Sequence, residues 1–212
     1  MFQYINIEKY FTECKHSYNR TKIKDMIEIS IITVVYNDCK GFKKTAKSVI
    51  SQTAMHNIQW IVIDAASTDG TTDIIRELNP YINYWSSEPD KGIYDGMNKG
   101  IAQAKGQYIL FLNAGDTLYN EFTTETLIKS SAFGHTDYIS GNTVYINEGQ
   151  AIGVNKAPKK ITGRFLFKES LCHPSTLIRT DRIKKNGGYD TSYRIAADAK
   201  FFFQDIVINN AS

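Results

Sequence analysis

The chain has 212 residues, 42% of them hydrophobic, and a formal net charge of +3. This length fits one α/β domain, and so small a positive charge gives no reason to expect a nucleic acid as a partner. The three cysteines are far apart and lack CxxC spacing, which argues against a disulfide framework and against a zinc site.

Residues 1–27 are interpreted as an N-terminal extension with one or two short helices, which packs on the core or mediates a homo-oligomer. Residues 1–10 lack the pattern of a secretory signal. No apolar run approaches the roughly 18 residues that a membrane-spanning helix needs. We therefore expect a cytoplasmic protein, and we leave open a peripheral position on the inner face of the plasma membrane.

Apolar runs rich in β-branched residues predict strands in the first half of the chain. These runs lie at residues 28–36, 58–64, 82–85 and 108–112. The first, second and fourth have few polar interruptions, which is typical of strands buried on both faces of a parallel sheet.

Helical patterns follow the first three of these strands. One reaches to about Gln52, and the next runs from Thr71 or Thr72 to Pro80. The third begins at Ile93, places its apolar residues three and four apart on one face, and is predicted to stop at Gly106. Repeated β-then-α units predict an α/β fold with a Rossmann-like, mostly parallel, right-handed sheet flanked by helices.

The pattern is less regular from residue 121 onward. We expect a helix over 121–131, a strand over 138–146, a basic irregular loop over 156–164, a strand over 173–179 and a last helix that starts near Ala196.

Acidic residues follow the strands at the predicted carboxyl edge of the sheet, where open α/β sheets bind ligands. They are Asp64, Asp69, Asp90 and Asp116. Taken singly, such residues often only cap helices and turns. Gathered at one edge, they suit a divalent cation held against phosphates, or hydrogen bonds to a ribose or a base. No GxGxxG follows the first strand and no GxxxxGK[ST] occurs, so the usual dinucleotide and phosphate-loop motifs are absent.

Five ordered motifs resemble the inverting glycosyltransferases of family 2, which have the GT-A (nucleotide-diphospho-sugar transferase) fold. The motifs are VVYN, DAASTDGT, SEPDKGIYDGMNKG, FLNAGD and AAD-K-FF. The third is particularly similar to bacterial enzymes that build O-antigens of lipopolysaccharide and other surface polysaccharides. The resemblance implies one GT-A domain over residues 28–212, with a nucleotide-sugar-binding half at 28–118 and an acceptor-side half at 119–212 that is short at its C-terminal end.

The resemblance also implies the residues that bind a UDP-sugar. They are Val34, Tyr36, Asn37, Asp64, Asp69, Asp90, Lys91, Asn98, Asn113 and Ala114. Asp116 would bind Mn²⁺ or Mg²⁺, although Asn113 and Gly115 stand where the family has a DxD motif. Lys91 is a natural partner for the diphosphate.

The resemblance places the catalytic base at Asp198, at the start of the last helix, and an acceptor-side or phosphate-side histidine at His173. The structural interpretations are a first-turn aspartate favoured by the helix dipole and a core histidine. The implied acceptor is an oligosaccharide linked to undecaprenyl diphosphate, and the donated sugar a hexose or N-acetylhexosamine. Two alternatives stay open: a sugar nucleotidyltransferase, and an inactive nucleotide-sugar-binding or scaffold subunit.

Overall fold

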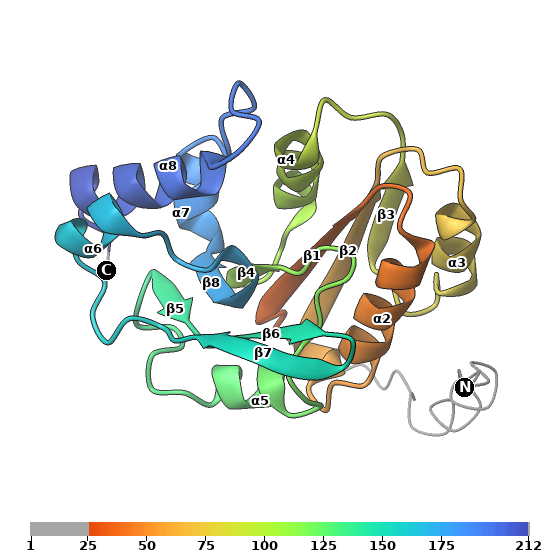
Figure 1. Cartoon of the computed structure of the whole chain (residues 1–212), viewed down its shortest axis with the longest axis horizontal. Coiled ribbons are helices and arrows are strands. Elements are labelled where there is room, and N and C mark those ends of the chain that lie inside the picture. Colours follow the sequence, from red (N-terminus) through yellow and green to blue (C-terminus); the bar gives the residue numbers. More distant parts are fainter. Residues whose placement is uncertain (1–25, 212) are drawn as a thin grey trace.

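The computed structural model describes residues 26–211, so the short helices expected in the N-terminal extension lie outside the described residues. Its centre is a six-stranded sheet with the strand order β3-β2-β1-β4-β8-β5 (Figure 1). Strands β1 to β4 are parallel to one another, and β8 runs antiparallel to both of its neighbours. The expected mostly parallel α/β sheet is confirmed. The strands are β1 (Ile29–Val35), β2 (Ile58–Asp64), β3 (Tyr84–Ser87), β4 (Tyr108–Phe111), β5 (Tyr138–Ser140) and β8 (Thr176–Arg179).

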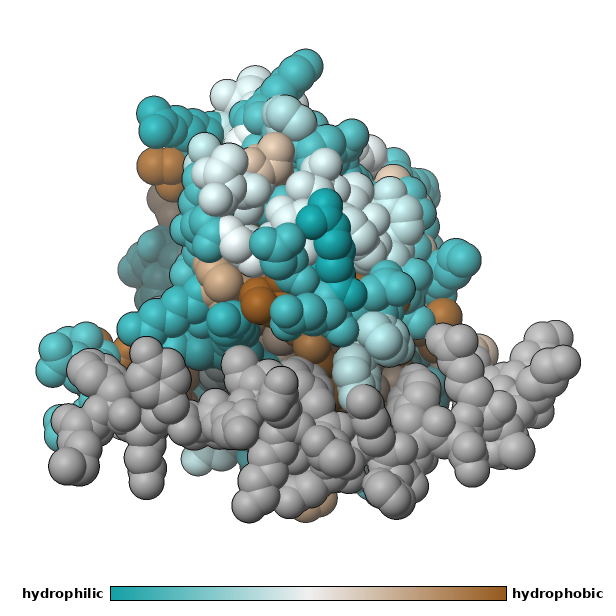
Figure 2. All heavy atoms as spheres, turned by 90° about the vertical axis from the view of Figure 1, so that its right-hand side faces the viewer, coloured by the Kyte–Doolittle hydropathy of each residue, from teal (hydrophilic) through white to brown (hydrophobic). Residues whose placement is uncertain are grey.

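Helices cover both faces of this sheet. Every residue of β1 and of β2 is buried, because each strand lies between two helical layers. The helices are α2 (Cys39–Ile50), α3 (Thr71–Glu77), α4 (Ile93–Gln103), α5 (Thr123–Ile128), α6 (Gly163–Lys168), α7 (Thr180–Lys185) and α8 (Ala197–Phe203). Short 3₁₀ turns lie at Met55–Asn57 and His173–Ser175, and a π-helix at Gln204–Ile208 continues α8. Seen from the side of α3, the coloured surface is mainly hydrophilic (Figure 2).

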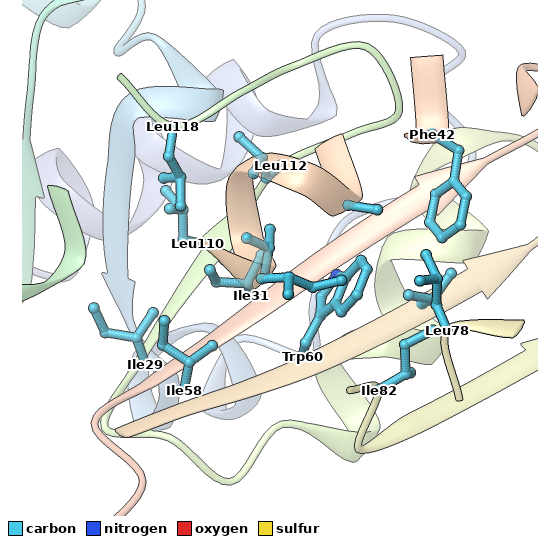
Figure 3. Close-up of a cluster of buried hydrophobic side chains, with 14 of the residues drawn as sticks. Ile29, Ile31, Phe42, Ile58, Trp60, Leu78, Ile82, Leu110, Leu112 and Leu118 are labelled. Carbon is cyan, nitrogen blue, oxygen red and sulfur yellow. The ribbon is translucent and has the colours of Figure 1, made fainter. Parts of the chain in front are cut away.

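The core divides into two clusters because successive residues of a strand point to opposite faces. In one cluster Ile31 and Trp60 pack with α2 and α3, and the rings of Phe42 and Trp60 lie 6.0 Å apart (Figure 3). In the other cluster Ile32 and its neighbours pack with apolar residues of α4, α7 and α8. The second cluster thus brings the last helices of the chain to the sheet face that α4 covers.

Several element boundaries differ from the prediction. The third strand lies at Tyr84–Ser87, two residues later than the predicted 82–85. Helix α4 ends at Gln103, before the expected stop at Gly106. Gly106 serves instead as a close contact, since a Cβ there would lie 2.5 Å from the backbone nitrogen of Ser30. Ile93 is 44% exposed and does not lie on the buried face of α4.

The segment predicted as one strand over 138–146 is divided. Its first part, β5, belongs to the main sheet, whereas β6 (Thr143–Asn147) pairs with β7 (Gln150–Asn155) in a separate two-stranded ribbon. Part of the predicted basic loop forms α6, and α7 was not predicted. Among residues 26–211 no helix has the length and apolar character needed to cross a membrane.

Candidate functional site

The carboxyl ends of β1, β2 and β4 meet at one edge of the sheet. Strand β1 lies between β2 and β4. The strands that follow β1 in sequence are added first on one side of it (β2 and β3) and then on the other (β4), so the strand order reverses beside β1. Ligands of open α/β sheets bind at such a topological switch point. The loops after both neighbours are attached to the end of β1. Ala65 N donates to Val35 O at 2.9 Å, and Ala114 N donates to Val34 O at 3.1 Å.

Hydrogen bonds join the loop after β1 to the loop after β2. Asn37 has a positive φ of 47°; its backbone N–H donates to Ser67 Oγ at 2.8 Å, and its Oδ1 accepts from Thr68 N at 2.8 Å. Asp69 accepts from Cys39 N at 2.8 Å. The Thr71 hydroxyl is the main cause of the lowered pKa of Asp69. Asn37 and Asp69 thus fix the geometry of this edge.

Asp64 is fully buried at the end of β2. Its carboxylate accepts from the Ser67 hydroxyl at 2.5 Å, the Ser87 hydroxyl at 2.6 Å and the Thr72 hydroxyl at 3.2 Å. These donors connect the loop after β2 with the end of β3. Asp64 therefore holds the loop after β2 and the end of β3 together from inside the protein. A depression of about 350 Å³ lies beside it, lined by Ser67, Thr72 and Ser87 among other residues.

The acidic loop after β4 is held by Thr45 of α2, a residue that the sequence analysis did not select. Thr45 is fully buried. Its Oγ1 lies 2.7 Å from Asp116 O and 3.2 Å from Asn113 O, and it accepts from Gly115 N at 3.0 Å. The one sequence signal is a polar residue on the apolar face of α2, and it does not reveal the partner.

Two side chains of this loop fit a divalent cation. The Oδ1 atom of Asn113 is buried and has no hydrogen-bond partner in the described part of the chain. Burial raises the pKa of the Asp116 carboxyl, because a buried site disfavours the charged form of an acid. An amide oxygen and a carboxylate are suitable ligands for Mg²⁺ or Mn²⁺. No group of three or more His, Cys, Asp or Glu residues that could hold a metal occurs within residues 26–211, so this loop alone is an incomplete ligand set.

The start of α4 lies against the end of β1. A Cβ on Gly96 would lie 2.8 Å from Val34 Cγ1 and 3.1 Å from Asp90 Oδ2, so Asp90 and Val34 are neighbours across this glycine. Asp90 also accepts from Gly92 N at 3.0 Å. Lys91 and Tyr36 are both exposed at this edge. Both side chains are accessible to a ligand.

Asp198 is tied to α4 by a contact that the sequence does not reveal. It lies in the first turn of α8, as expected, and its Oδ1 accepts from the Tyr94 hydroxyl at 2.8 Å. Burial and this bond raise the pKa of Tyr94 to about 12, so the phenol stays a donor at neutral pH. Because Tyr94 lies four residues beyond Asp90, the contact connects Asp198 with the end of β1.

His173 lies in an aromatic cluster behind Asp198. Its ring stacks on Phe111 with centroids 4.6 Å apart, and Nε2 lies 2.7 Å from the Tyr189 hydroxyl. Burial lowers the pKa of His173 to about 4, so the imidazole is neutral at physiological pH. Asn98 holds the same tyrosine, since it donates to Tyr189 O and accepts from Tyr189 N, both at 2.8 Å. His173 and Asn98 thus support the site from within the protein.

Comparisons with known proteins agree with this architecture. Residues 30–192 match the family model described as "Glycosyl transferase family 2". An uncharacterized glycosyltransferase of Mycobacterium tuberculosis is 30% identical over 185 residues, which are 85% of this chain and 69% of the relative. The putative teichuronic acid biosynthesis glycosyltransferase TuaG of Bacillus subtilis is 31% identical over 117 residues, 52% of this chain and 46% of TuaG.

Two solved structures share the fold. Residues 1–349 of S. aureus TarS in complex with UDP-GlcNAc give a TM-score of 0.68 at 22% identity, over 82% of this chain and 52% of that one. The mannosyltransferase PcManGT of Pyrobaculum calidifontis, in complex with GDP-Man and Mn²⁺, gives 0.60 at 14% identity, over 92% of this chain and 57% of that one. The chain thus spans about half the length of each of these two solved chains.

Proposed function

The chain belongs to glycosyl transferase family 2, and from this premise we propose that it is an inverting, metal-dependent glycosyltransferase. In this proposal it moves a hexose or N-acetylhexosamine from a UDP-sugar to an oligosaccharide linked to undecaprenyl diphosphate, in surface polysaccharide or O-antigen synthesis. TuaG is described as a putative teichuronic acid biosynthesis glycosyltransferase, which supports a role in the synthesis of a surface polysaccharide. The UDP-GlcNAc complex of TarS supports the UDP-sugar.

The observation that carries the proposal is the pair of oxygen ligands after β4. The buried Asn113 Oδ1 lacks a hydrogen-bond partner among residues 26–211, and the Asp116 carboxyl lies close in sequence, with its pKa raised by burial. Buried oxygens without a donor are costly unless a ligand satisfies them. Asp116 and Asn113 would therefore hold Mn²⁺ or Mg²⁺, and a bound cation would neutralise charge on the departing diphosphate.

Residues at the ends of β1 and β2 would bind the nucleotide. Tyr36 offers an exposed aromatic face to the base, and Asn37 and Asp69 fix the loops around it. Lys91 is exposed, and its ammonium group can pair with the diphosphate as a point charge. Residues 28–118 would thus bind the nucleotide-sugar, and residues 119–212 would receive the acceptor.

Asp198 would act as the general base. In an inverting transfer a carboxylate takes the proton from the acceptor hydroxyl while that oxygen attacks the anomeric carbon, and the bond to UDP breaks on the opposite face. Tyr94 engages Oδ1 of Asp198 at 2.8 Å, so the second oxygen is left for the acceptor. His173, neutral and packed on Phe111, would keep the aromatic cluster next to Asp198 rigid.

Calorimetric titration tests the donor site. We expect UDP to bind in the presence of Mn²⁺ and to bind much more weakly in EDTA, and GDP serves as the comparison nucleotide. Asp116→Ala should lose the metal-dependent part of the affinity, whereas Asp181→Asn, which changes an exposed carboxylate on α7, should not. An unchanged affinity in Asp116→Ala would remove Asp116 from the site.

Transfer assays test the base. Asp198→Asn should keep UDP affinity and lose about 10²- to 10⁴-fold in turnover, the usual contribution of a general base. Full transfer by this variant would refute the assignment. UDP binding without transfer to any acceptor would favour an inactive binding subunit, and pyrophosphate release from UTP and a sugar phosphate would favour a nucleotidyltransferase.

A further inference from the structure

The β6–β7 ribbon lies outside the six-stranded sheet (Figure 1) and exposes large apolar side chains. Val144 is paired with Val154, and Ile146 and Ile152 lie two residues farther toward the turn on each strand. Alternate residues of a strand point the same way, so Val144, its partner Val154 and Ile146 share one face. Ile152 is the extra residue at the register shift opposite Tyr145 and Ile146. Ile146 is 63% exposed and Ile152 is 69% exposed. Large aliphatic side chains gathered this way on a surface are a mark of an interaction site.

A run of cations follows the ribbon directly. Residues 149–168 contain no Asp or Glu and five basic residues, all of them exposed. In the described part of the chain none of the five takes part in an ion pair. The basic residues are Lys156, Lys159, Lys160, Arg164 and Lys168.

Helix α6 continues the same combination of apolar and basic side chains. Phe165 and Leu166 pack against the core cluster. Arg164, Phe167 and Lys168 lie three and four residues apart, on one side of the helix, and Phe167 is 83% exposed. The segment that leads to α6 is attached to the base of the ribbon, because Ala157 N donates to Asn142 Oδ1 at 2.9 Å.

We propose that the apolar face of the ribbon and the basic segment 156–168, together called the ribbon surface, dock on an anionic lipid surface. Aliphatic and aromatic side chains would enter the boundary between headgroups and acyl chains, and the lysines and arginine would pair with lipid phosphates. A soluble polyanion would use the cations but leave the isoleucines in water. A second copy paired through the same face would bring two sets of unpaired cations together.

This inference goes beyond the proposed function and is consistent with it, because an acceptor carried on a lipid would be met at such a surface. Its test uses neither donor nor acceptor, so its outcome is independent of whether the chain transfers a sugar. The measurement is co-sedimentation of the full chain with phosphatidylcholine vesicles that contain or lack phosphatidylglycerol.

Two variants of the ribbon surface and one matched control are compared. Lys156→Gln/Lys159→Gln/Lys160→Gln removes three cations, and Ile146→Ser/Ile152→Ser removes the exposed aliphatic groups. The control, Lys40→Gln/Lys43→Gln/Lys44→Gln, removes three exposed cations from α2, where no large apolar side chain is exposed. Thermal unfolding of each variant reports whether it is folded, and all the changed residues lie at the surface.

We expect the wild-type chain to bind the anionic vesicles and not the neutral ones. The ribbon lysine variant should bind up to about 100-fold more weakly, since each cation near an anionic surface contributes about fivefold. The isoleucine variant should also lose binding, and the α2 control should change by less than about twofold. Absent binding to anionic vesicles would overturn the proposal. So would equal losses in the two lysine variants, or a dimer in sedimentation analysis that Ile146→Ser/Ile152→Ser dissociates.

Discussion

Thr45→Val tests whether helix α2 holds the candidate metal loop. The side chain is fully buried, and its hydroxyl accepts from Gly115 N at 3.0 Å and lies 2.7 Å from Asp116 O. Valine keeps the β-branched shape and so changes the helical preference little. The substitution therefore replaces one hydroxyl group with a methyl group of similar size.

The magnitude follows from the partners that lose this hydroxyl. In the variant the Gly115 N–H loses its acceptor and the Asp116 carbonyl loses a donor, which should lower the free energy of unfolding by about 1–3 kcal/mol. For a chain of this size each kcal/mol lowers Tm by about 2–4 °C. Part of this free energy is the cost of ordering the loop, which ligand binding must then supply. If that part is about 1.4 kcal/mol, the Mn²⁺-dependent affinity for UDP falls about tenfold.

Urea unfolding and calorimetric titration of UDP with Mn²⁺ measure the two effects. Thr45→Ser is the matched control: it keeps the hydroxyl and loses a methyl group, so it should lose about 1 kcal/mol of stability and none of the affinity. The reasoning is refuted if Thr45→Val matches the wild type in both measurements, or if valine and serine lower the affinity equally.

Three further outcomes are expected. Tyr94→Phe removes the donor to Asp198 and should lower kcat about tenfold with an unchanged KM for the donor in steady-state kinetics; a change confined to KM would contradict a role in positioning the base. Burial lowers the pKa of His173 to about 4, below about 6.5 in the unfolded chain, so the unfolded state takes up the proton first. Stability should therefore fall by up to about 3 kcal/mol as the pH drops from 6.5 to 4, and urea unfolding of His173→Gln at both pH values should show a smaller fall; an equal fall would disprove the assignment. Gly106→Ala places a Cβ 2.5 Å from the backbone of β1, whereas Gly141→Ala meets its nearest atom at 3.5 Å; the first should lower the free energy of unfolding by at least about 2 kcal/mol and the second by much less, and equal values would show that the contact at Gly106 relaxes freely.

The strand and helix pattern of the first half could be predicted because it is local. The predicted 58–64 strand coincides with β2, and the acidic residues after β2 and β4 lie at the carboxyl edge, as the order of β1, β2 and β4 requires. Prediction was poorer from residue 121 onward. There the segment over 138–146 is shared between two sheets, and strand pairing depends on partners distant in sequence.

The candidate site was predicted residue by residue only through the resemblance of its motifs, and the assigned roles stay predictions. Sequence patterns did not reveal which carboxylates and amide oxygens already accept hydrogen bonds from other residues of the protein. Asp64 accepts from the Ser67 and Ser87 hydroxyls inside the protein, whereas the side-chain oxygen of Asn113 is left without a partner among residues 26–211. Hydrophobic periodicity carries no information about such polar contacts.

The sequence by itself determined the alternation of buried strands and helices, and through five motifs the family. Only the tertiary structure decided that Thr45 supports the loop after β4, where its hydroxyl contacts the carbonyl oxygen of Asp116, a residue 71 positions farther along the chain. It likewise decided that Tyr94 holds Asp198 across 104 positions. The physical reason is that burial patterns repeat over a few residues, whereas a hydrogen bond between distant segments forms only after the sheet has brought them together.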